Sequence, residues 1–412
     1  MQFKEIIGQI ETKQHLIQMY KQNRLSHALL FLGKEGSGAL SLARAFAQYI
    51  VCEKVNGKSD NKNQSGASLF GDEPVEEVAT EDITNDSCGV CLACQKAAKL
   101  IHPDIHFSFP TITIKKDRPT ISNDLLVKWR EFVQLHPYGN SYDWLQFIQA
   151  ENKQGNINAA ECNEINRMLS LKSFEAEYKI LIMWMPELLG KEGNKLLKLI
   201  EEPPPNTLFL FVAQNEQLIL QTILSRTQLI KIPSLSNSEI ATALVNREGL
   251  ENDKAIQIAG MSEGNYHEAL NQLQHIEDNW EVVLRDWLNT ILKTGPAAQV
   301  KWIEEIAKIG REKQKQFLRY FNHLLEQAIR IRVMGDSFQD VSSSLNVNQI
   351  AINDFAIKIN RFCDIAQQEA IIKEIDTATY HIERNANAKI LFHSLTIKLY
   401  HIIRNKSVIL VS

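Results

Sequence analysis

The feature that most constrains the fold is a buried strand followed directly by a glycine-rich turn and a helix. Residues 29–32 form an apolar run, and residues 39–46 repeat apolar side chains with helical period. The turn between them has the spacing of a phosphate-binding loop, G-x-x-x-x-G-K-[ST], and contains Gly33, Gly36 and Gly38. This layout predicts a parallel α/β domain of the nucleotide-binding type.

The two positions after the last glycine have lost the chemistry of such a loop. They hold Ala39 and Leu40, where the pattern requires a lysine for the β- and γ-phosphates and a hydroxyl for Mg²⁺. Alanine carries no charge, and leucine offers no oxygen to a hard cation. Backbone N–H groups and the helix N-terminus still attract anions. We therefore expect weak nucleotide binding at most and no productive binding of Mg-ATP. The alternative is a plain strand-to-helix turn.

A second buried strand, residues 180–185, argues independently against ATP hydrolysis. In P-loop ATPases the end of this strand carries an Asp for the metal and often a Glu for the attacking water. Here those places hold Trp184 and Met185. A helix that ends at three prolines and two further strands follow, over residues 194–200, 207–212 and 228–232.

Length and composition narrow the class of protein. A chain of 412 residues predicts two or three domains, and 44% hydrophobic with 23% charged residues is typical of a globular protein. The net charge of −4 weighs against a strongly basic nucleic-acid binder. We expect no signal peptide, no membrane partner and a cytoplasmic location, because the sequence contains no suitable apolar run.

Four of the six cysteines predict a structural metal site. Cys88, Cys91 and Cys94 form C-x-x-C-x-x-C, and Cys52 at the far end of a polar, acidic insertion (residues 53–87) is the obvious fourth ligand. Zinc in structural sites takes four ligands, and four sulfurs leave no open position for catalysis. An iron–sulfur cluster is the rival occupant. The remaining two cysteines, Cys162 and Cys363, stand alone and are expected in the core.

Taken together, these motifs resemble bacterial clamp-loader subunits of the AAA+ class, most closely the delta prime type of DNA polymerase III. The resemblance covers roughly residues 6–232. It rests on Ile7-Gly8-Gln9, Ser26-His27-Ala28, the glycine loop, the cysteine motif, His102-Pro103-Asp104, the block from Asn194 to Pro204, and Ile223-Leu224-Ser225-Arg226. In that family the cysteine quartet binds zinc. The gap after Cys52 is much longer here, so Cys52 is the least certain ligand.

The resemblance also implies a role for Arg226. The family's Ser-Arg-Cys motif is here Ser225-Arg226-Thr227, and its arginine enters the ATP site of the neighbouring subunit. Such an arginine finger contributes about 10³–10⁵ in rate. The alternative is a surface arginine with an ion pair. A second arginine of the family, which touches the nucleotide, is replaced here by His267.

We expect three domains. Residues 1–232 form the AAA+ α/β domain, with a zinc module at about 52–94 and insertions at 53–87 and 110–156. Residues 233–278 form a small helical lid, and residues 279–412 a helical collar for oligomerisation.

The implied function is that of a stator: a subunit with no ATPase of its own that joins gamma/tau and delta subunits in a hetero-pentamer. Through that complex it would act on the sliding clamp and primed DNA. The alternatives are an active gamma/tau-type ATPase and a zinc-bearing DNA-binding adaptor.

Overall fold

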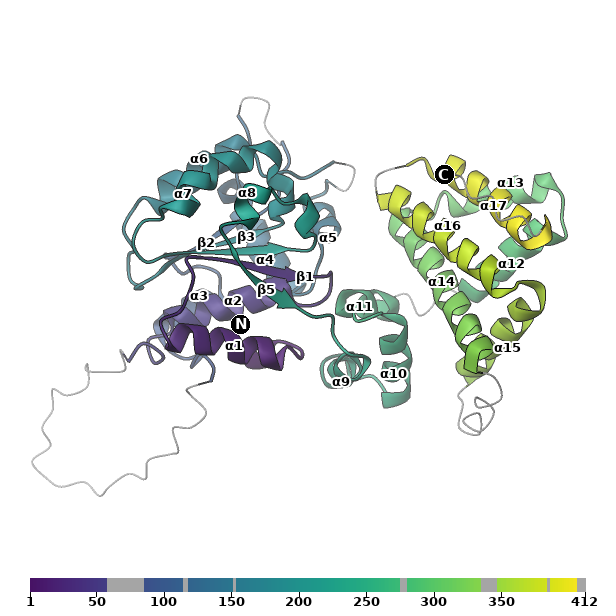
Figure 1. The fold of residues 1–412 in the computed structure, drawn as a ribbon, viewed down its shortest axis with the longest axis horizontal. Helices are drawn as coiled ribbons and strands as arrows, with labels where there is room; N and C mark the ends of the chain where they lie inside the picture. Colours follow the sequence, from purple (N-terminus) through teal and green to yellow (C-terminus); the bar gives the residue numbers. More distant parts are fainter. Residues whose placement is uncertain are drawn as a thin grey trace, which may run out of the picture. The chain divides into compact units, whose positions relative to one another are not determined.

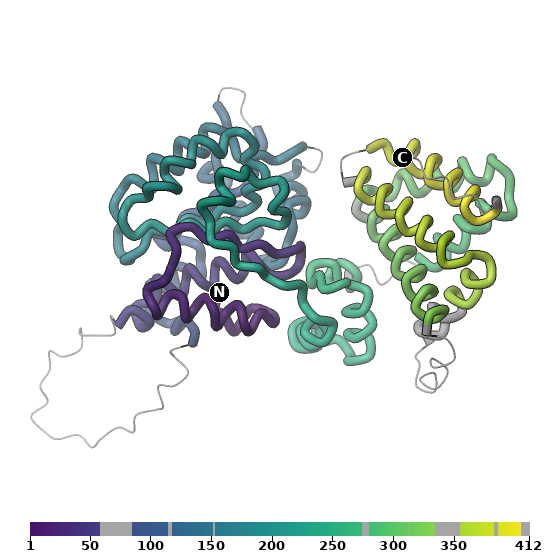
Figure 2. Tube along the Cα trace, viewed as in Figure 1, coloured from purple at the N-terminus to yellow at the C-terminus, as the bar shows by residue number. Residues whose placement is uncertain are grey.

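The computed structural model describes residues 1–57, 85–113, 118–150, 153–274, 280–334, 347–383 and 386–405. Most of the expected insertion at 53–87 lies outside these residues. The chain divides into two compact units, Met1–Gln274 and His275–Ser412. Figure 2 traces both units, which are described here one at a time. The expected division into three domains stays a prediction.

A five-stranded parallel sheet forms the centre of the first unit (Figure 1). The strands are β1 (Ala28–Gly33), β2 (Ile105–Ser108), β3 (Lys179–Trp184), β4 (Thr207–Ala213) and β5 (Gln228–Ile232). Their order is β2-β3-β4-β1-β5, so the strand that leads into the glycine loop is flanked by β4 and β5. The predicted fold class, a parallel α/β domain followed by helices, is confirmed.

Alternate residues of the sheet are buried against helices on opposite faces. Phe31, Ile182 and Leu210 point into one core, and Leu30, Met183 and Phe211 into the other. Burial on both sides explains why these strands read as continuous apolar runs. The helices on the first face include α1 (Ile10–Lys21), α2 (Ala39–Val51), α4 (Leu126–Leu135) and α5 (Ser141–Phe147). Those on the second include α6 (Ala159–Leu169), η3 (Pro186–Leu196), α7 (Leu197–Glu201) and α8 (Gln221–Leu224).

The expected insertion at 110–156 contributes α4 and α5 to the first core. One of its two fully buried tryptophans, Trp129, stacks on Phe109 at 4.2 Å between ring centroids. Trp129 also lies 5.2 Å from Trp184 of β3, which connects this region directly to the sheet. The aromatic residue at the end of β3 therefore serves packing.

Three short helices close the first unit and are called the lid: α9 (Asn237–Glu248), α10 (Asn252–Met261) and α11 (Tyr266–Gln274). Ser236 caps α9 in a capping box with Glu239. The lid shares a core with two residues from outside it, Ile7 and Tyr138. The smaller elements of this unit are η1 (Phe3–Glu5), α3 (Leu92–Ala98), η2 (Ser122–Leu125) and η4 (Glu216–Leu218).

The second unit consists of helices in its described part: α12 (Trp280–Leu292), α13 (Pro296–Ile306), α14 (Arg311–Met334), α15 (Val347–Phe362), α16 (Ile365–Glu383) and α17 (Ala388–Asn405). Its apolar stripes face inward. Trp287 stacks on Trp302 at 4.9 Å, and its indole N–H donates to the Thr396 hydroxyl at 3.0 Å. No helix in the described residues has the length and hydropathy needed to cross a bilayer.

Replacement of Trp129 by alanine should strongly destabilise the first unit. The change removes a buried indole that contacts both Phe109 and Trp184, and we expect a loss of about 3–5 kcal/mol in the free energy of unfolding. Urea unfolding followed by circular dichroism measures the loss. The matched control is Val127→Ala on the same helix, because Val127 is 67% exposed and should cost about 0.5 kcal/mol or less. Equal costs for the two variants would contradict this account of the core.

Candidate functional site

The glycine loop has the backbone expected of a phosphate-binding loop. It begins at Gly33, the last residue of β1, and Gly38 precedes the first residue of α2. Gly36 and Gly38 have φ of 72° and 85°, the left-handed region that glycine adopts without strain. The glycine turn thus connects a strand to a helix as expected, and its role in nucleotide binding stays a prediction.

Other parts of the chain pack directly against these two glycines. A Cβ atom on Gly38 would lie 2.8 Å from the ring of Tyr138, and one on Gly36 would lie 2.7 Å from the backbone nitrogen of Tyr266. The Tyr266 N–H in turn lies 3.4 Å from the carbonyl oxygen of Gly36 and donates to it. The absence of side chains thus serves contact with Tyr138 and with the lid.

A cluster of polar side chains lies beside the loop. The Glu35 carboxylate accepts from the side-chain amides of Asn140 at 3.0 Å and Asn265 at 3.4 Å. His267 is 7% exposed, and its Nε2 lies 3.2 Å from an Asp143 carboxylate oxygen and 4.0 Å from Glu35. Two carboxylates next to the loop disfavour a triphosphate, because like charges repel most strongly where water is partly excluded.

The four residues that replace ATPase chemistry are all buried. Ala39 and Leu40 are each 8% exposed at the first turn of α2 and contribute to the apolar core. Trp184 and Met185 at the end of β3 belong to that same core. Apolar side chains at these positions can neither hold Mg²⁺ nor activate water.

Arg226 lies on the surface directly after α8, with 35% of its side chain exposed. Its guanidinium forms an ion pair with Glu201 at the end of α7, with Nη2 2.5 Å and Nε 2.6 Å from the same carboxylate oxygen. Nη1 also donates to the carbonyl oxygen of Thr222 at 2.8 Å. In this chain the arginine is thus held by its own neighbours through contacts of a kind that a phosphate can replace.

The structure brings the four predicted cysteines together. Cys52 follows α2, Cys88 lies in the turn before α3, Cys91 caps α3 and Cys94 lies in its first turn. One sulfur from each lies within 4.8 Å of the others, and those of Cys88 and Cys94 are 3.9 Å apart. A tetrahedron of 2.3 Å zinc–sulfur bonds separates its sulfurs by about 3.8 Å, so the four residues fit a metal of this kind.

Hydrogen bonds within the cluster already favour a thiolate. The Cys94 thiol and the backbone N–H of Cys88, 3.3 Å from the sulfur, lower the pKa of Cys52 despite its burial. The same interaction with Cys52, together with burial, raises the pKa of Cys94. Four adjacent sulfurs cannot all carry charge unless a cation compensates them, so binding of a metal would remove the competition between them.

The sequence did not identify the residues that pack against the loop. Tyr138, Asn140 and Asp143 belong to a region whose packing the sequence left open, and Asn265 lies in the turn before α11. The one available signal was Glu35, an acidic residue inside a loop that normally binds phosphate. The partners of Glu35 are far away in the sequence, so no local pattern could have identified them.

Comparison with known proteins finds relatives over much of the chain. The family described as "DNA polymerase III, delta subunit" matches residues 8–73 and 61–236. The delta' subunit of DNA polymerase III from Haemophilus influenzae is 25% identical, over 66% of this chain and 63% of that protein. The tau subunit from Bacillus subtilis is 23% identical, over 79% and 46%. The delta' subunit from Escherichia coli is 22% identical, over 76% and 73%. The chain therefore spans between 46% and 73% of the length of these relatives.

Replacement of Gly36 by alanine should destabilise the first unit, because it disturbs the contact between the loop and the lid. The new methyl group has to adopt a left-handed backbone, which costs about 1–2 kcal/mol, and it also meets Asn265 and the backbone of Tyr266. We expect a total loss of about 2–5 kcal/mol in the free energy of unfolding, measured by urea denaturation.

The control is Gly57→Ala, because Gly57 has a similar φ of 67° with nothing within 4 Å of the added atom. The difference between the two variants isolates the contact with the lid. If both variants lose the same free energy of unfolding, the contact between the lid and the loop contributes nothing to stability.

Proposed function

The chain belongs to the clamp-loader delta prime family of DNA polymerase III, and from this premise we propose that it acts in DNA replication as a clamp-loader subunit that hydrolyses no ATP itself and completes a neighbour's ATP site with Arg226. The single observation that carries the proposal is the combination of a glycine loop without its lysine and hydroxyl and a surface guanidinium on the same domain. The first leaves the domain without chemistry of its own, and the second offers chemistry to another subunit.

The residues at the catalytic positions support the absence of ATP hydrolysis. Transfer of a phosphoryl group requires a lysine, Mg²⁺ and an oriented water molecule. Ala39, Leu40 and Trp184 supply none of these, and Tyr138 occupies space beside the loop. An active gamma/tau-type ATPase would need to replace all these residues. Steady turnover of ATP by the isolated chain would therefore favour that alternative and contradict this part of the proposal.

The environment of Arg226 supports a role in trans. An exposed ion pair contributes only about 0–1 kcal/mol, so little free energy is lost when Arg226 leaves Glu201. A phosphate group offers the guanidinium two anionic oxygens in place of the single Glu201 oxygen, together with more charge. Glu201 therefore holds the arginine near the surface without competing strongly against a nucleotide on the adjacent subunit.

The cysteine cluster is proposed to bind one structural Zn²⁺ through Cys52, Cys88, Cys91 and Cys94. When bound, the ion supplies folding free energy and no catalysis, because four protein sulfurs fill its coordination shell. The long separation between Cys52 and the other three does not oppose this, since their sulfurs are already within bonding range of a common centre.

The partners follow from family membership and are proposed with it. Relatives are named delta' and tau subunits of DNA polymerase III. We propose that gamma/tau and delta subunits assemble with this chain in a hetero-pentamer that places the sliding clamp on primed DNA. The helices of the second unit are proposed as the collar that joins the subunits.

Replacement of Arg226 by alanine should lower the DNA-stimulated ATPase of the reconstituted complex while assembly persists. The site that loses its arginine should slow by about 10³-fold or more, so the complex loses that site's share of turnover. Arg226→Lys should fail as well, because an ammonium lacks the planar fork of donors. Size-exclusion chromatography checks assembly, and a phosphate-release assay measures turnover.

The matched control is Arg167→Ala. Arg167 is also exposed and also forms an ion pair, with Glu164 at 2.6 Å, on α6 of the same domain. Its loss should leave turnover unchanged. An assembled Arg226→Ala complex with full ATPase would remove the assignment of this arginine.

Metal analysis of the purified chain should find about one Zn²⁺ per molecule and no iron. Cys91→Ser should lower that occupancy severalfold and lower the melting temperature, because one of four ligands is lost. Cys162→Ser is the control, since Cys162 is buried away from the cluster and should leave the zinc content unchanged. Stoichiometric iron, or a metal-free chain that is as stable as the metal-loaded one, would contradict the zinc proposal.

A further inference from the structure

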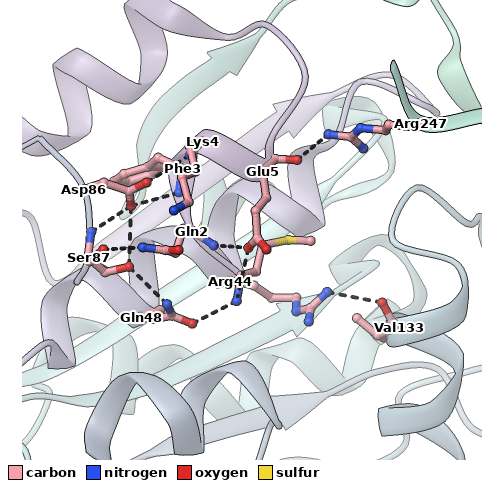
Figure 3. A network of polar contacts seen from close by, with 11 residues as sticks. Gln2, Phe3, Lys4, Glu5, Arg44, Gln48, Asp86, Ser87, Val133 and Arg247 are labelled. Carbon is pink, nitrogen blue, oxygen red and sulfur yellow. Dashed lines mark hydrogen bonds and ion pairs between the residues drawn. The ribbon is translucent and has the colours of Figure 1, made fainter. Parts of the chain in front are cut away.

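One short segment near the start of the chain contacts both the cysteine cluster and the lid. We call residues 2–9 the N-terminal clasp. Its successive residues bind different partners, and Figure 3 shows the network at its first half. These contacts take no part in the function proposed above. They connect two regions that the sequence gives no reason to associate.

The first residues of the clasp bind the turn immediately before Cys88. The Asp86 carboxylate accepts from the backbone N–H groups of Phe3 at 2.9 Å and Lys4 at 3.0 Å (Figure 3). The side-chain amide of Gln2 donates to the backbone carbonyl of Ser87. The two N–H groups lie at the start of the clasp, and one carboxylate satisfies both of them. This end of the clasp therefore depends on the position of Asp86.

The cysteine turn also contacts the clasp and α2 by other routes. A Cβ atom on Gly89, which has φ of 71°, would lie 2.9 Å from the side-chain oxygen of Gln2, so this glycine permits a close approach. The Gln48 amide of α2 donates to the Ser87 hydroxyl at 3.0 Å. The two residues before Cys88 are thus held by the clasp on one side and by α2 on the other.

The second half of the clasp binds the lid and its surroundings. The backbone carbonyl of Glu5 accepts from Nη2 of Arg247, on α9 of the lid, at 2.5 Å (Figure 3). The other contacts are from the Ile7 N–H to the Tyr138 hydroxyl at 2.9 Å, and from the Gln9 amide to the carbonyls of Ser37 at 3.3 Å and Pro233 at 2.7 Å.

Arg247 contacts both the clasp and the two tyrosines that pack against the glycine loop. Its guanidinium carbon lies 5.9 Å from the ring centroids of both Tyr138 and Tyr266, within range of a cation–π interaction. These two rings contact each other edge to face at 5.0 Å. They are also the residues packed against Gly38 and Gly36. The path from cysteine cluster to loop is therefore continuous.

We propose that the N-terminal clasp couples metal binding at the four cysteines to closure of the lid on the phosphate loop. The inference rests on the metal site proposed above. A bound cation fixes the backbone of Cys88 to Cys94, and Asp86 is only two residues from the first of these ligands. Without the cation the N–H groups of Cys88, Cys91 and Cys94 keep only weak hydrogen bonds to sulfur. The clasp then has a less rigid anchor, and its ordering costs more conformational entropy.

The coupling acts in both directions. If metal favours the closed lid, then contacts that hold the lid must favour the metal by the same factor. Arg247 is the natural residue to test from the lid side, because it binds the clasp and is far in sequence from every cysteine ligand. Coupling between sites is commonly about 5- to 150-fold in affinity, which sets the scale of the expected effect.

Hydrogen exchange on the full chain tests the coupling. The chain is loaded with one Zn²⁺ and compared with the same chain after chelation, with metal analysis on both samples. Amides of residues 265–270 in the lid should exchange about tenfold faster after chelation. Amides of β4, at the centre of the sheet, should not change, which shows that the domain remains folded.

Asp86→Ala should retain Zn²⁺ and lose the distant effect, with less than about a twofold change at residues 265–270 on chelation. Glu131→Ala, an exposed acidic residue on α4, is the control and should behave as the unmodified chain. If Asp86→Ala fails to fold, Gln2→Ala takes its place, because Gln2 forms the other bond to the turn. From the lid side, Arg247→Ala should weaken the equilibrium affinity for Zn²⁺ about fivefold or more, measured by competition with a chromogenic chelator.

Exchange at residues 265–270 that is the same with and without Zn²⁺ would overturn the coupling and leave the metal site standing. Full coupling in both Asp86→Ala and Gln2→Ala would show that it does not pass through the clasp. A chain that never retains Zn²⁺ would overturn both this inference and the proposed metal site, and metal analysis separates that result from the others.

Discussion

The architecture of the first unit depends on how closely other segments approach the backbone of the glycine loop. Gly36 and Gly38 lack side chains, so the backbone of Tyr266 and the ring of Tyr138 reach positions that any Cβ atom would obstruct. In a phosphate-binding loop the same openness admits the phosphates. Here one physical property, the absence of a side chain, serves protein packing, and the lid lies directly against the loop.

The fold does not need the groups that ATPase chemistry requires, because the two depend on different atoms. The sheet requires backbone hydrogen bonds and buried apolar side chains on both faces, and Trp184 satisfies these demands better than an aspartate would. Catalysis requires a few charged groups at the ends of strands. Removal of those groups costs the sheet nothing, and Arg226 keeps its charge at the surface in an ion pair with Glu201.

The cysteine module presents the opposite case, in which too little core is available. In the described residues it contains one short helix, α3, and its ends are joined to the domain by Cys52, Asp86 and Ser87. A segment this small cannot bury enough apolar surface to offset its own ordering entropy. The Asp86 carboxylate supplies part of that order through its bonds to the clasp, and a cation held by the four sulfurs would supply more.

The sequence alone determined the strand–loop–helix frame, the group of four cysteines and the apolar residues at the catalytic positions, because each depends on residues close in sequence or on the chemistry of single side chains. Cys52 is separated from the other three cysteines by the long insertion. It could be identified as the fourth candidate ligand only because its thiol is of the same chemical type as theirs. Only the tertiary structure decided which residues pack against the loop and which residues bind Arg226. Glu35 meets Asn265, Glu201 meets Arg226 and Glu5 meets Arg247 only after distant segments fold together, and no local period records such contacts.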